Sequence, residues 1–280
     1  MTVTIIGLGL IGGSLAKDLR ANGFADRLIG VDASEEHAAQ ALTLQLVDET
    51  RPLAEGCAEA DLVLLAVPVG AVVKLMPQVL NLIGEQTVVT DMGSTKHEIA
   101  RAIAGHPRRR QAVLAHPMAG TEFSGPHAAV NHLFFQKAAI ICDKEASDPA
   151  AVALVERLFK SLFMRLLYMN SEEHDLHTAY VSHVSHISSF VLALTVLEKE
   201  KSEANIFNLA SGGFASTARL AKSSPRMWAD VYQQNARHLV DVLDSYLDKM
   251  QQFRDLIAAG QFEETYRLMA EANEIRRILQ

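Results

Sequence analysis

The sequence has little of what marks several protein classes. Of its 280 residues only two are cysteines, Cys57 and Cys142, which lie far apart in apolar surroundings and form no CxxC pair. This predicts reduced core thiols, typical of a cytoplasmic protein, with a single disulfide as the alternative. Basic residues are outnumbered, 26 against 33 acidic ones, which gives a net charge of −7. The one short basic run, at 108–110, is typical of a solvated turn, so no nucleic-acid partner is expected.

Long hydrophobic runs are also scarce. The most apolar run, "LVLLAVPVGAVV" at 62–73, is too short to span a bilayer and is interrupted by Pro68 and Gly70. The N-terminal "MTVTIIGLG" begins directly with a strand pattern and lacks the basic region that opens a signal peptide. We therefore expect a soluble, cytoplasmic protein with no membrane partner.

What the sequence does have is a change of period near residue 170. Up to that point short β-branched runs alternate with helix-like segments, which indicates parallel strands joined by crossover helices. The predicted fold of residues 1–170 is therefore an α/β domain with a doubly wound, mostly parallel sheet. Its expected strands are VTIIG (3–7), LIGV (28–31), LVLLAV (62–67), TVVTD (87–91), AVLAH (112–116), AAIIC (138–142) and RLLYM (165–169).

Residues 171–280 predict a second domain that is all helical. Positions 171–201 contain no Gly or Pro and predict one long helix capped by Ser171, and a second helix is expected from Ser224-Pro225 to Gly260. A last helix is expected over 262–279. Because long apolar stripes are usually buried against a partner as well as within the chain, we expect a homodimer formed by residues beyond Asn170. The stripe of the second helix comprises Trp228, Val231, Leu239, Val242, Tyr246, Met250, Phe253 and Ile257.

A glycine-rich turn follows the first strand and opens a helix, as in Rossmann-like domains. Gly7, Gly9 and Gly12 have the GxGxxG spacing, in which the glycines permit a tight turn, a close approach to a pyrophosphate and close helix packing. Asp32 ends the second strand twenty residues later, where a carboxylate binds ribose hydroxyls and repels a 2′-phosphate. The sequence therefore predicts an NAD site, against the alternative of a structural turn with an incidental acid. The expected cofactor-binding residues are Gly7, Leu8, Gly9, Leu10, Ile11, Gly12, Asp32, Val67, Pro68 and Asp91.

Further loops end other strands and should line the same crevice. The segments 64–69 and 88–96 follow the fourth and fifth strands, whose carboxyl ends border the ligand site of an open α/β sheet. Asp91 and Ser94 are candidates to contact the cofactor or the substrate. The alternative is that they cap a helix predicted over Lys96–Ala104.

The stretch "AHPMAGTEFSGPH" at 115–127 also follows a strand. It is rich in residues that stiffen a turn and in titratable side chains, and Pro117 and Gly120 fix a short loop around His116. A neutral histidine can accept a proton from a hydroxyl while hydride leaves the same carbon. An ordinary surface turn is the alternative that composition alone would favour.

Five segments resemble one family. "GLGLIGGS" (7–14), "DMGSTK" (91–96), "HPMAGTEFSG" (116–125), "SHVSH" (182–186) and "RLAKSSPRMW" (219–228) are similar, in this order, to prephenate dehydrogenases. The similarity runs from end to end, at the length of members without a mutase or regulatory domain. It implies a Rossmann-like domain plus a helical dimerisation domain. It also implies NAD-dependent oxidative decarboxylation of prephenate to 4-hydroxyphenylpyruvate in tyrosine biosynthesis, or the use of arogenate to give tyrosine directly.

The resemblance also implies roles for individual residues. His116 corresponds to the histidine at the ring hydroxyl, and Ser94 to the serine that helps to orient it. Arg219 corresponds to an arginine that pairs with a substrate carboxylate, and Glu122 to an acid that gates entry by pairing with that arginine. Many members have Asp where this chain has Ser216, so an Arg–Asp pair is missing. The expected substrate-binding residues are Arg219, His186, His183, Glu122, Gly120, Thr121 and Trp228, the last with a core or interface role as alternative.

Other interpretations of the sequence are weaker. His174, His177, His183 and His186 are spaced to share helix faces, but no further ligand set supports a metal site, and His174 and His177 are expected at the surface or the dimer interface. β-Hydroxyacid dehydrogenases and imine reductases join similar domains but rely on a lysine in the helical half. A non-catalytic NAD-binding protein is the alternative from another class. Tyrosine is a candidate inhibitor that competes in the pocket.

Overall fold

The computed structural model describes residues 1–201, 203 and 205–278. These residues form two compact units, Met1–Asn235 and the segment that starts at Ala236. The domain boundary predicted from the sequence near residue 170 lies inside the first unit, and it stays a prediction. Leu279, the end of the last predicted helix, lies outside the described residues.

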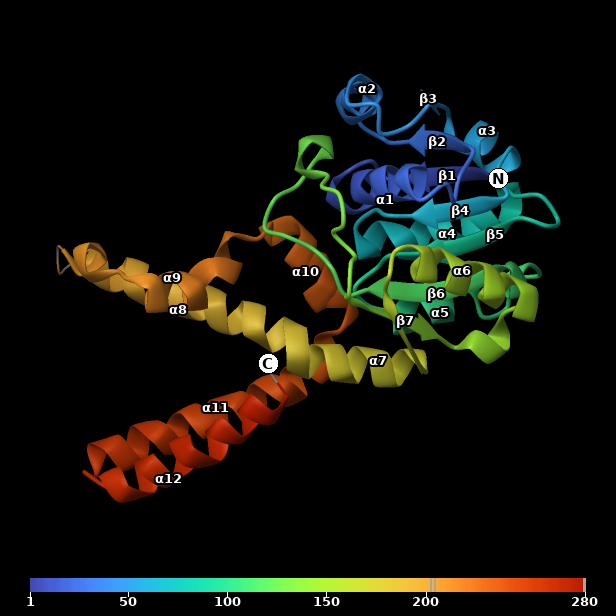
Figure 1. Cartoon of the computed structure of the whole chain (residues 1–280). Helices are drawn as coiled ribbons and strands as arrows, with labels where there is room; N and C mark the ends of the chain where they lie inside the picture. The colour runs from blue at the N-terminus through green and yellow to red at the C-terminus, as the bar shows by residue number, and fades with distance from the viewer. Residues whose placement is uncertain (202, 204, 279–280) are drawn as a thin grey trace. The chain divides into compact units, whose positions relative to one another are not determined.

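Within the described residues the first unit is built on one eight-stranded sheet with the order β3-β2-β1-β4-β5-β6-β7-β8 (Figure 1). Neighbouring strands are parallel except β6 and β7, which confirms a mostly parallel sheet. All seven predicted strands are present, and the two-residue β3 was too short to show a period. The strands are β1 Thr2–Ile6, β2 Arg27–Val31, β3 Glu49–Thr50, β4 Leu62–Leu65, β5 Val88–Asp91, β6 Ala112–Pro117, β7 Ala138–Cys142 and β8 Arg165–Met169.

Helices cover both faces of this sheet. Alternate strand residues enter two different hydrophobic clusters: Leu64 packs in the cluster of α1 and α6, and Leu65 in the cluster of α4 and α5. Burial on both faces explains why these strands are almost continuously apolar. The helices are α1 Leu10–Ala21, α2 Glu35–Thr43, α3 Leu53–Ala58, α4 Val69–Leu82, α5 His97–Ile103 and α6 Pro149–Ser161. Cys57 and Cys142 are free, buried thiols, as expected.

The long helix expected after residue 170 is present but not uniform. It consists of α7 (Ser171–Thr178), a π-helical turn (Ala179–His183) and α8 (Val184–Glu200). The predicted cap at Ser171 is wrong. The cap is Asn170, whose side chain accepts a hydrogen bond from the Glu173 amide at 2.8 Å, while Ser171 donates its own amide to Asp143. By length and composition the helix 171–200 could cross a membrane, and it is mostly exposed in this chain. The run at 62–73 forms β4 and the start of α4 instead.

The helix predicted from Ser224 to Gly260 is interrupted. Ser224 caps α10 (Pro225–Gln234), as expected, but the chain leaves the helical conformation at Asn235. A separate helix α11 (Ala236–Ala258) follows and ends before Gly260, which has a φ of +67°. The second unit comprises α11, α12 (Phe262–Ala272) and a 3-10 turn at Asn273–Arg277. In the first unit α9 (Gly212–Ala218) precedes α10, which packs on α4.

Candidate active site

The carboxyl ends of four parallel neighbours, β1, β4, β5 and β6, lie at one edge of the sheet. The strand order reverses direction between β1 and β4, since β2 and β3 lie on one side of β1 and all later strands on the other. A ligand crevice forms at such a reversal in open α/β sheets. The candidate residues after these four strands therefore face one region.

The glycine turn after β1 leaves no room for larger residues. Gly7 has a φ of +95°, and a Cβ on it would lie 2.6 Å from the Ala66 carbonyl oxygen after β4. A Cβ on Gly12 would lie 1.9 Å from the Gly7 carbonyl oxygen. Helix α1 starts at Leu10, so its free amides point to the turn, where they favour an anion. Leu8 is fully buried, so a cofactor would meet the backbone of this residue.

Asp32 lies beside the glycine turn. One carboxylate oxygen accepts a hydrogen bond from the Leu8 amide at 2.8 Å and the other from the Ser34 amide at 2.9 Å. The side chain remains 12% exposed, and each oxygen keeps a free lone pair for a ribose hydroxyl. On the opposite side of the crevice Val67 is half-buried and Pro68, the N-cap of α4, is exposed.

The segment after β5 contains a buried ion pair. Asp91 and Lys96 are both fully buried and paired, and Asp91 also accepts the Gly93 amide at 2.9 Å and the Ala115 amide at 3.2 Å. The Lys96 ammonium also donates a hydrogen bond to the Ala115 carbonyl oxygen at 2.7 Å. This ion pair and its hydrogen bonds link β5 to β6. The Asp91 carboxylate is therefore occupied by contacts within the protein and supports the site rather than facing a cofactor. Ser94 is half-buried, and its hydroxyl has no hydrogen-bond partner within the described residues.

Neither Asp91 nor Ser94 caps α5. The cap comes from Asp175 on α7, which accepts the amides of Lys96 at 2.8 Å and of His97 at 2.9 Å. The capping interpretation of the sequence is therefore wrong, because the capping carboxylate lies about eighty residues further along the chain.

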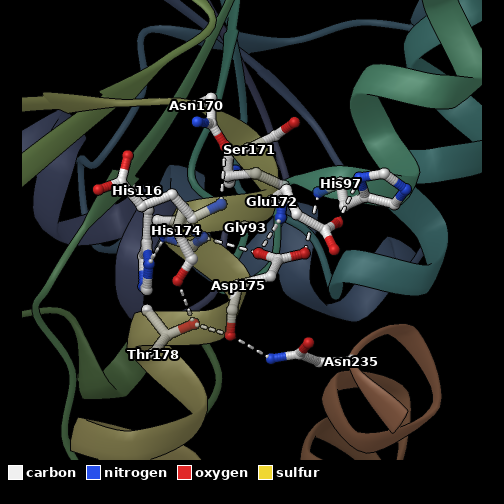
Figure 2. A network of polar contacts seen from close by, with 12 residues as sticks. Gly93, His97, His116, Asn170, Ser171, Glu172, His174, Asp175, Thr178 and Asn235 are labelled. Atoms are coloured by element: carbon white, nitrogen blue, oxygen red, sulfur yellow. Dashed lines mark hydrogen bonds and ion pairs between the residues drawn. The ribbon is translucent and has the colours of Figure 1, made fainter. Parts of the chain in front are cut away.

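His116 is the last residue but one of β6 and is 8% exposed. Its Nδ1 lies 2.9 Å from Nε2 of His174, whose Nδ1 lies 2.7 Å from Asp175 (Figure 2). Burial, then the neighbouring His174 and Lys96, hold the pKa of His116 well below its usual range. The imidazole is therefore neutral at pH 7 and able to accept a proton. The expectation that His174 lies at the surface is wrong, because this residue is fully buried.

The loop after His116 crosses to the glycine turn. Its amide nitrogen at Gly125 lies 4.0 Å from where a Cβ on Gly9 would stand. Beyond it, the Val130 amide donates to Ser14 at 3.0 Å and Lys17 donates to the Ala129 carbonyl at 2.8 Å, which anchors the loop on α1. The loop thus links the histidine to the dinucleotide turn, and it carries Gly120 and Thr121, both exposed.

A second polar group lies on α8, α10 and the turn after α9. Arg219 lies 3.7 Å from Glu122 of the loop, so the structure brings together the two residues that the resemblance pairs. The ring of His186 stacks on Trp228 with centroids 3.6 Å apart. Burial lowers the pKa of His186, and the positive charge of Arg219 lowers it further. Ser216 is exposed and donates within α9 to Gly213, so it does not replace the missing acid.

Trp228 and His183 form the inner wall of this group. Trp228 is 6% exposed and belongs to the core cluster of α4, yet its buried Nε1 has no partner within the described residues. His183 is 1% exposed, lies 3.2 Å from the Asn235 amide nitrogen, and has a pKa lowered to about 4 by burial. Its predicted contact with substrate stays a prediction. His177 is exposed, and no group of metal-binding side chains occurs in the part of the chain that the structure describes.

Four polar residues at the site were missed in the sequence. Lys96, His174, Asp175 and Asn235 are all buried there. The only local signal was that His174, Asp175 and Thr178 share a helix face, and nothing in the sequence distinguishes a buried polar face from a solvated one.

Comparison with known proteins assigns the family. Residues 15–168 match the family model for the prephenate dehydrogenase nucleotide-binding domain, and residues 170–271 match the model for the prephenate dehydrogenase dimerization domain. The chain belongs to the prephenate dehydrogenase family. The resemblance seen in the sequence is thereby confirmed, together with the Rossmann-like and helical parts of the fold.

Individual relatives of this family agree. The chain is 32% identical to a prephenate dehydrogenase of Bacillus subtilis, over 98% of this chain and 75% of that protein. It superposes on a prephenate dehydrogenase from A. aeolicus in complex with hydroxyphenyl propionate and NAD+, with a TM-score of 0.87 and 27% identity over 100% of this chain and 98% of that one. A Synechocystis arogenate dehydrogenase gives a TM-score of 0.77 and 27% identity, covering 100% of both chains.

Proposed function

We propose that this protein is an NAD-dependent prephenate dehydrogenase, which converts prephenate to 4-hydroxyphenylpyruvate and carbon dioxide on the route to tyrosine. The observation that carries the proposal is the neutral, nearly buried His116 at the end of β6, joined by its loop to the glycine turn. Family membership and the relatives' names support the substrate.

The residues divide the chemistry between them. The turn Gly7–Gly12 and Asp32 would hold NAD, which would supply the acceptor for the hydride that leaves the carbinol carbon of the substrate. His116 accepts the hydrogen of the ring hydroxyl as the hydride leaves, with Ser94 orienting the hydroxyl. Loss of carbon dioxide from the opposite ring carbon then makes the ring aromatic and returns the hydrogen to the phenol. Aromatisation drives the reaction, so the protein mainly orients and polarises.

The substrate is a dianion and needs a cation. Arg219 supplies a planar fork for one carboxylate, and Glu122, 3.7 Å away, occupies it when no substrate is bound. His186, fixed by its stack on Trp228, faces the side chain of the substrate. Gly120 and Thr121 contribute from the exposed loop.

We expect turnover of prephenate with NAD, at a higher kcat/KM than with NADP, because the Asp32 carboxylate repels a 2′-phosphate. The measurement is nicotinamide absorbance with prephenate, arogenate or 3-hydroxyisobutyrate and each cofactor. Asp32→Ser should reduce the ratio of kcat/KM with NAD to kcat/KM with NADP. Glu35→Ser, at an exposed acid nearby, should leave that ratio unchanged. Equal or better kcat/KM with NADP contradicts the cofactor assignment. NAD binding without turnover of any substrate indicates a binding protein instead.

The β-hydroxyacid alternative loses support from the structure. That mechanism needs a free lysine near the hydroxyl, contributed by the helical half. Lys96, whose charge lowers the pKa of His116, follows β5 of the sheet, is fully buried and is paired with Asp91.

We expect a homodimer formed through α8 and its surroundings. Apolar side chains there are exposed in the single chain, an arrangement typical of interfaces: Val181 at 70%, Val191 at 55%, Leu194 at 64% and Leu209 at 85%. Leu194→Glu should shift the mass measured by light scattering at micromolar concentration from dimer towards monomer. Phe163→Glu, at an equally exposed residue beside β8, should leave the dimer intact. A wild-type monomer under these conditions contradicts the proposal.

Three finer assignments are part of the same proposal. The enzyme is cytoplasmic, where NAD is available. Residues 1–170 bind the dinucleotide, and 171–280 dimerise and bind substrate. Tyrosine, which shares the hydroxyphenyl ring and the carboxylate of the product, competes for the Arg219 pocket.

A further inference from the structure

We propose that Asp175 and His174 are positioning residues that hold the proton of neutral His116 on Nδ1, so that Nε2 is the nitrogen that accepts hydrogen from the substrate hydroxyl. The proposal rests on the function proposed above. It assigns roles to two buried residues of α7 that the site otherwise leaves unexplained.

The direction of the chain of contacts starts at Asp175. Burial by itself raises the pKa of this carboxyl, but the hydrogen bonds from His174 and from the amides of His97 and Lys96 lower it overall. Asp175 is therefore an anion at neutral pH and can only accept hydrogen bonds. Because it lies 2.7 Å from Nδ1 of His174, that nitrogen carries the proton.

The next contact follows from the charge of His174. This ring is fully buried, and burial lowers its pKa, so it is neutral at pH 7. With its one proton on Nδ1, its Nε2 is an acceptor. The nitrogen 2.9 Å away, Nδ1 of His116, must therefore donate.

The remaining nitrogen of His116 is then an acceptor by elimination. Within the described residues Nε2 has no hydrogen-bond partner, and it is not among the buried side-chain atoms that lack one, so it is open to the crevice. The opposite tautomer would place two lone pairs 2.9 Å apart between His116 and His174. If the proton of His174 also moved, from Nδ1 to Nε2, the repulsion would instead arise between the lone pair on Nδ1 of His174 and the Asp175 carboxylate.

The arrangement is rigid because Asp175 is held from two sides. Its carboxylate receives two amides at the start of α5, and its carbonyl oxygen accepts the Asn235 side chain at 2.7 Å (Figure 2). As positive charge develops on His116 during the reaction, its Nδ1–H bond to His174, polarised by the Asp175 anion, grows stronger. The two residues should therefore act on kcat rather than on substrate affinity.

The test compares two substitutions of His174. Phenylalanine keeps the ring but removes both hydrogen bonds, and we expect His174→Phe to lower kcat about 10- to 100-fold with little change in KM for NAD or prephenate. Glutamine offers an amide oxygen to Nδ1 of His116, so His174→Gln should recover a large part of that loss. His177→Phe, at the exposed histidine one turn later, is the matched control and should leave kcat unchanged.

A second measurement needs no substrate. Nitrogen-15 NMR of histidine-labelled free enzyme, with the His116 signals identified by their loss in His116→Asn, should show the proton on Nδ1 in the wild type and a tautomer mixture in His174→Phe. A wild-type proton on Nε2 overturns the proposal. A normal kcat in His174→Phe also overturns it. The same holds if both His174 variants lose kcat equally and in proportion to a loss of thermal stability. Failure of the wild type to oxidise prephenate refutes the proposed function and leaves the NMR result valid.

Discussion

His116→Asn is expected to lower kcat with prephenate about 10²–10⁴-fold with little change in KM. The imidazole accepts the proton of the ring hydroxyl as the hydride departs, so its contribution to stabilisation grows towards the transition state. Asparagine retains a polar group of similar size, and NAD affinity should survive because His116 does not belong to the glycine turn. His127→Asn, at an exposed histidine further along the same loop, serves as the control.

The pH dependence of activity should report the same group. The pKa of His116 lies well below its usual value near 6.5, because the buried ring is held neutral. Protonated His116 cannot accept hydrogen, so kcat/KM should stay constant as the pH falls to about 6.5 and decline only below it. His116→Asn should abolish that decline. A near-normal kcat in this variant would mean that the histidine is structural.

Arg219→Ala is expected mainly to raise KM for prephenate. The resulting decrease in kcat/KM should correspond to about 2–4 kcal/mol. The guanidinium pairs with a carboxylate that is present in both the ground state and the transition state, so binding suffers more than chemistry. Arg219 is 53% exposed and, among the described residues, pairs with Glu122; a bound substrate would exclude water from the new pair with its carboxylate.

The control for this prediction is Arg226→Ala, at an exposed arginine at the start of α10. Its KM should match the wild type, and the NAD affinity of both variants should be unchanged. An unchanged KM in Arg219→Ala would show that the carboxylate is held elsewhere, with His186 the next candidate.

Much of the fold was predictable because its signals are local. A strand buried on both faces must be apolar along its whole length, and this property located six of the eight strands. The seventh, β8, is an exposed edge strand whose run of large apolar residues still showed in the sequence. A turn that carries Gly7 at a φ of +95° admits few other residues, so the GxGxxG spacing predicted the turn and the helix after it. The resemblance, carried by short segments such as "HPMAGTEFSG", predicted the family.

Other features of the fold were not local. The apolar stripe predicted one helix, but the helix breaks at Asn235. The side chain of Asn235 donates a hydrogen bond to the Asp175 carbonyl oxygen, 60 residues earlier in the chain. The α5 cap comes from Asp175 rather than from a neighbour in sequence. Strands β7 and β8 run antiparallel to the other strands of the sheet, and direction leaves no trace in the period of a strand.

The sequence by itself determined the class of fold and the position of the dinucleotide turn, because each depends on residue types within a few positions of one another. The family resemblance of a short segment singled out His116 as the candidate base. Only the tertiary structure decided what surrounds that base. His174 and Asp175 resemble the exposed polar residues of any helix until packing removes their water. Once buried, each must find a partner, and the partners lie on β6 and α5, far away in sequence.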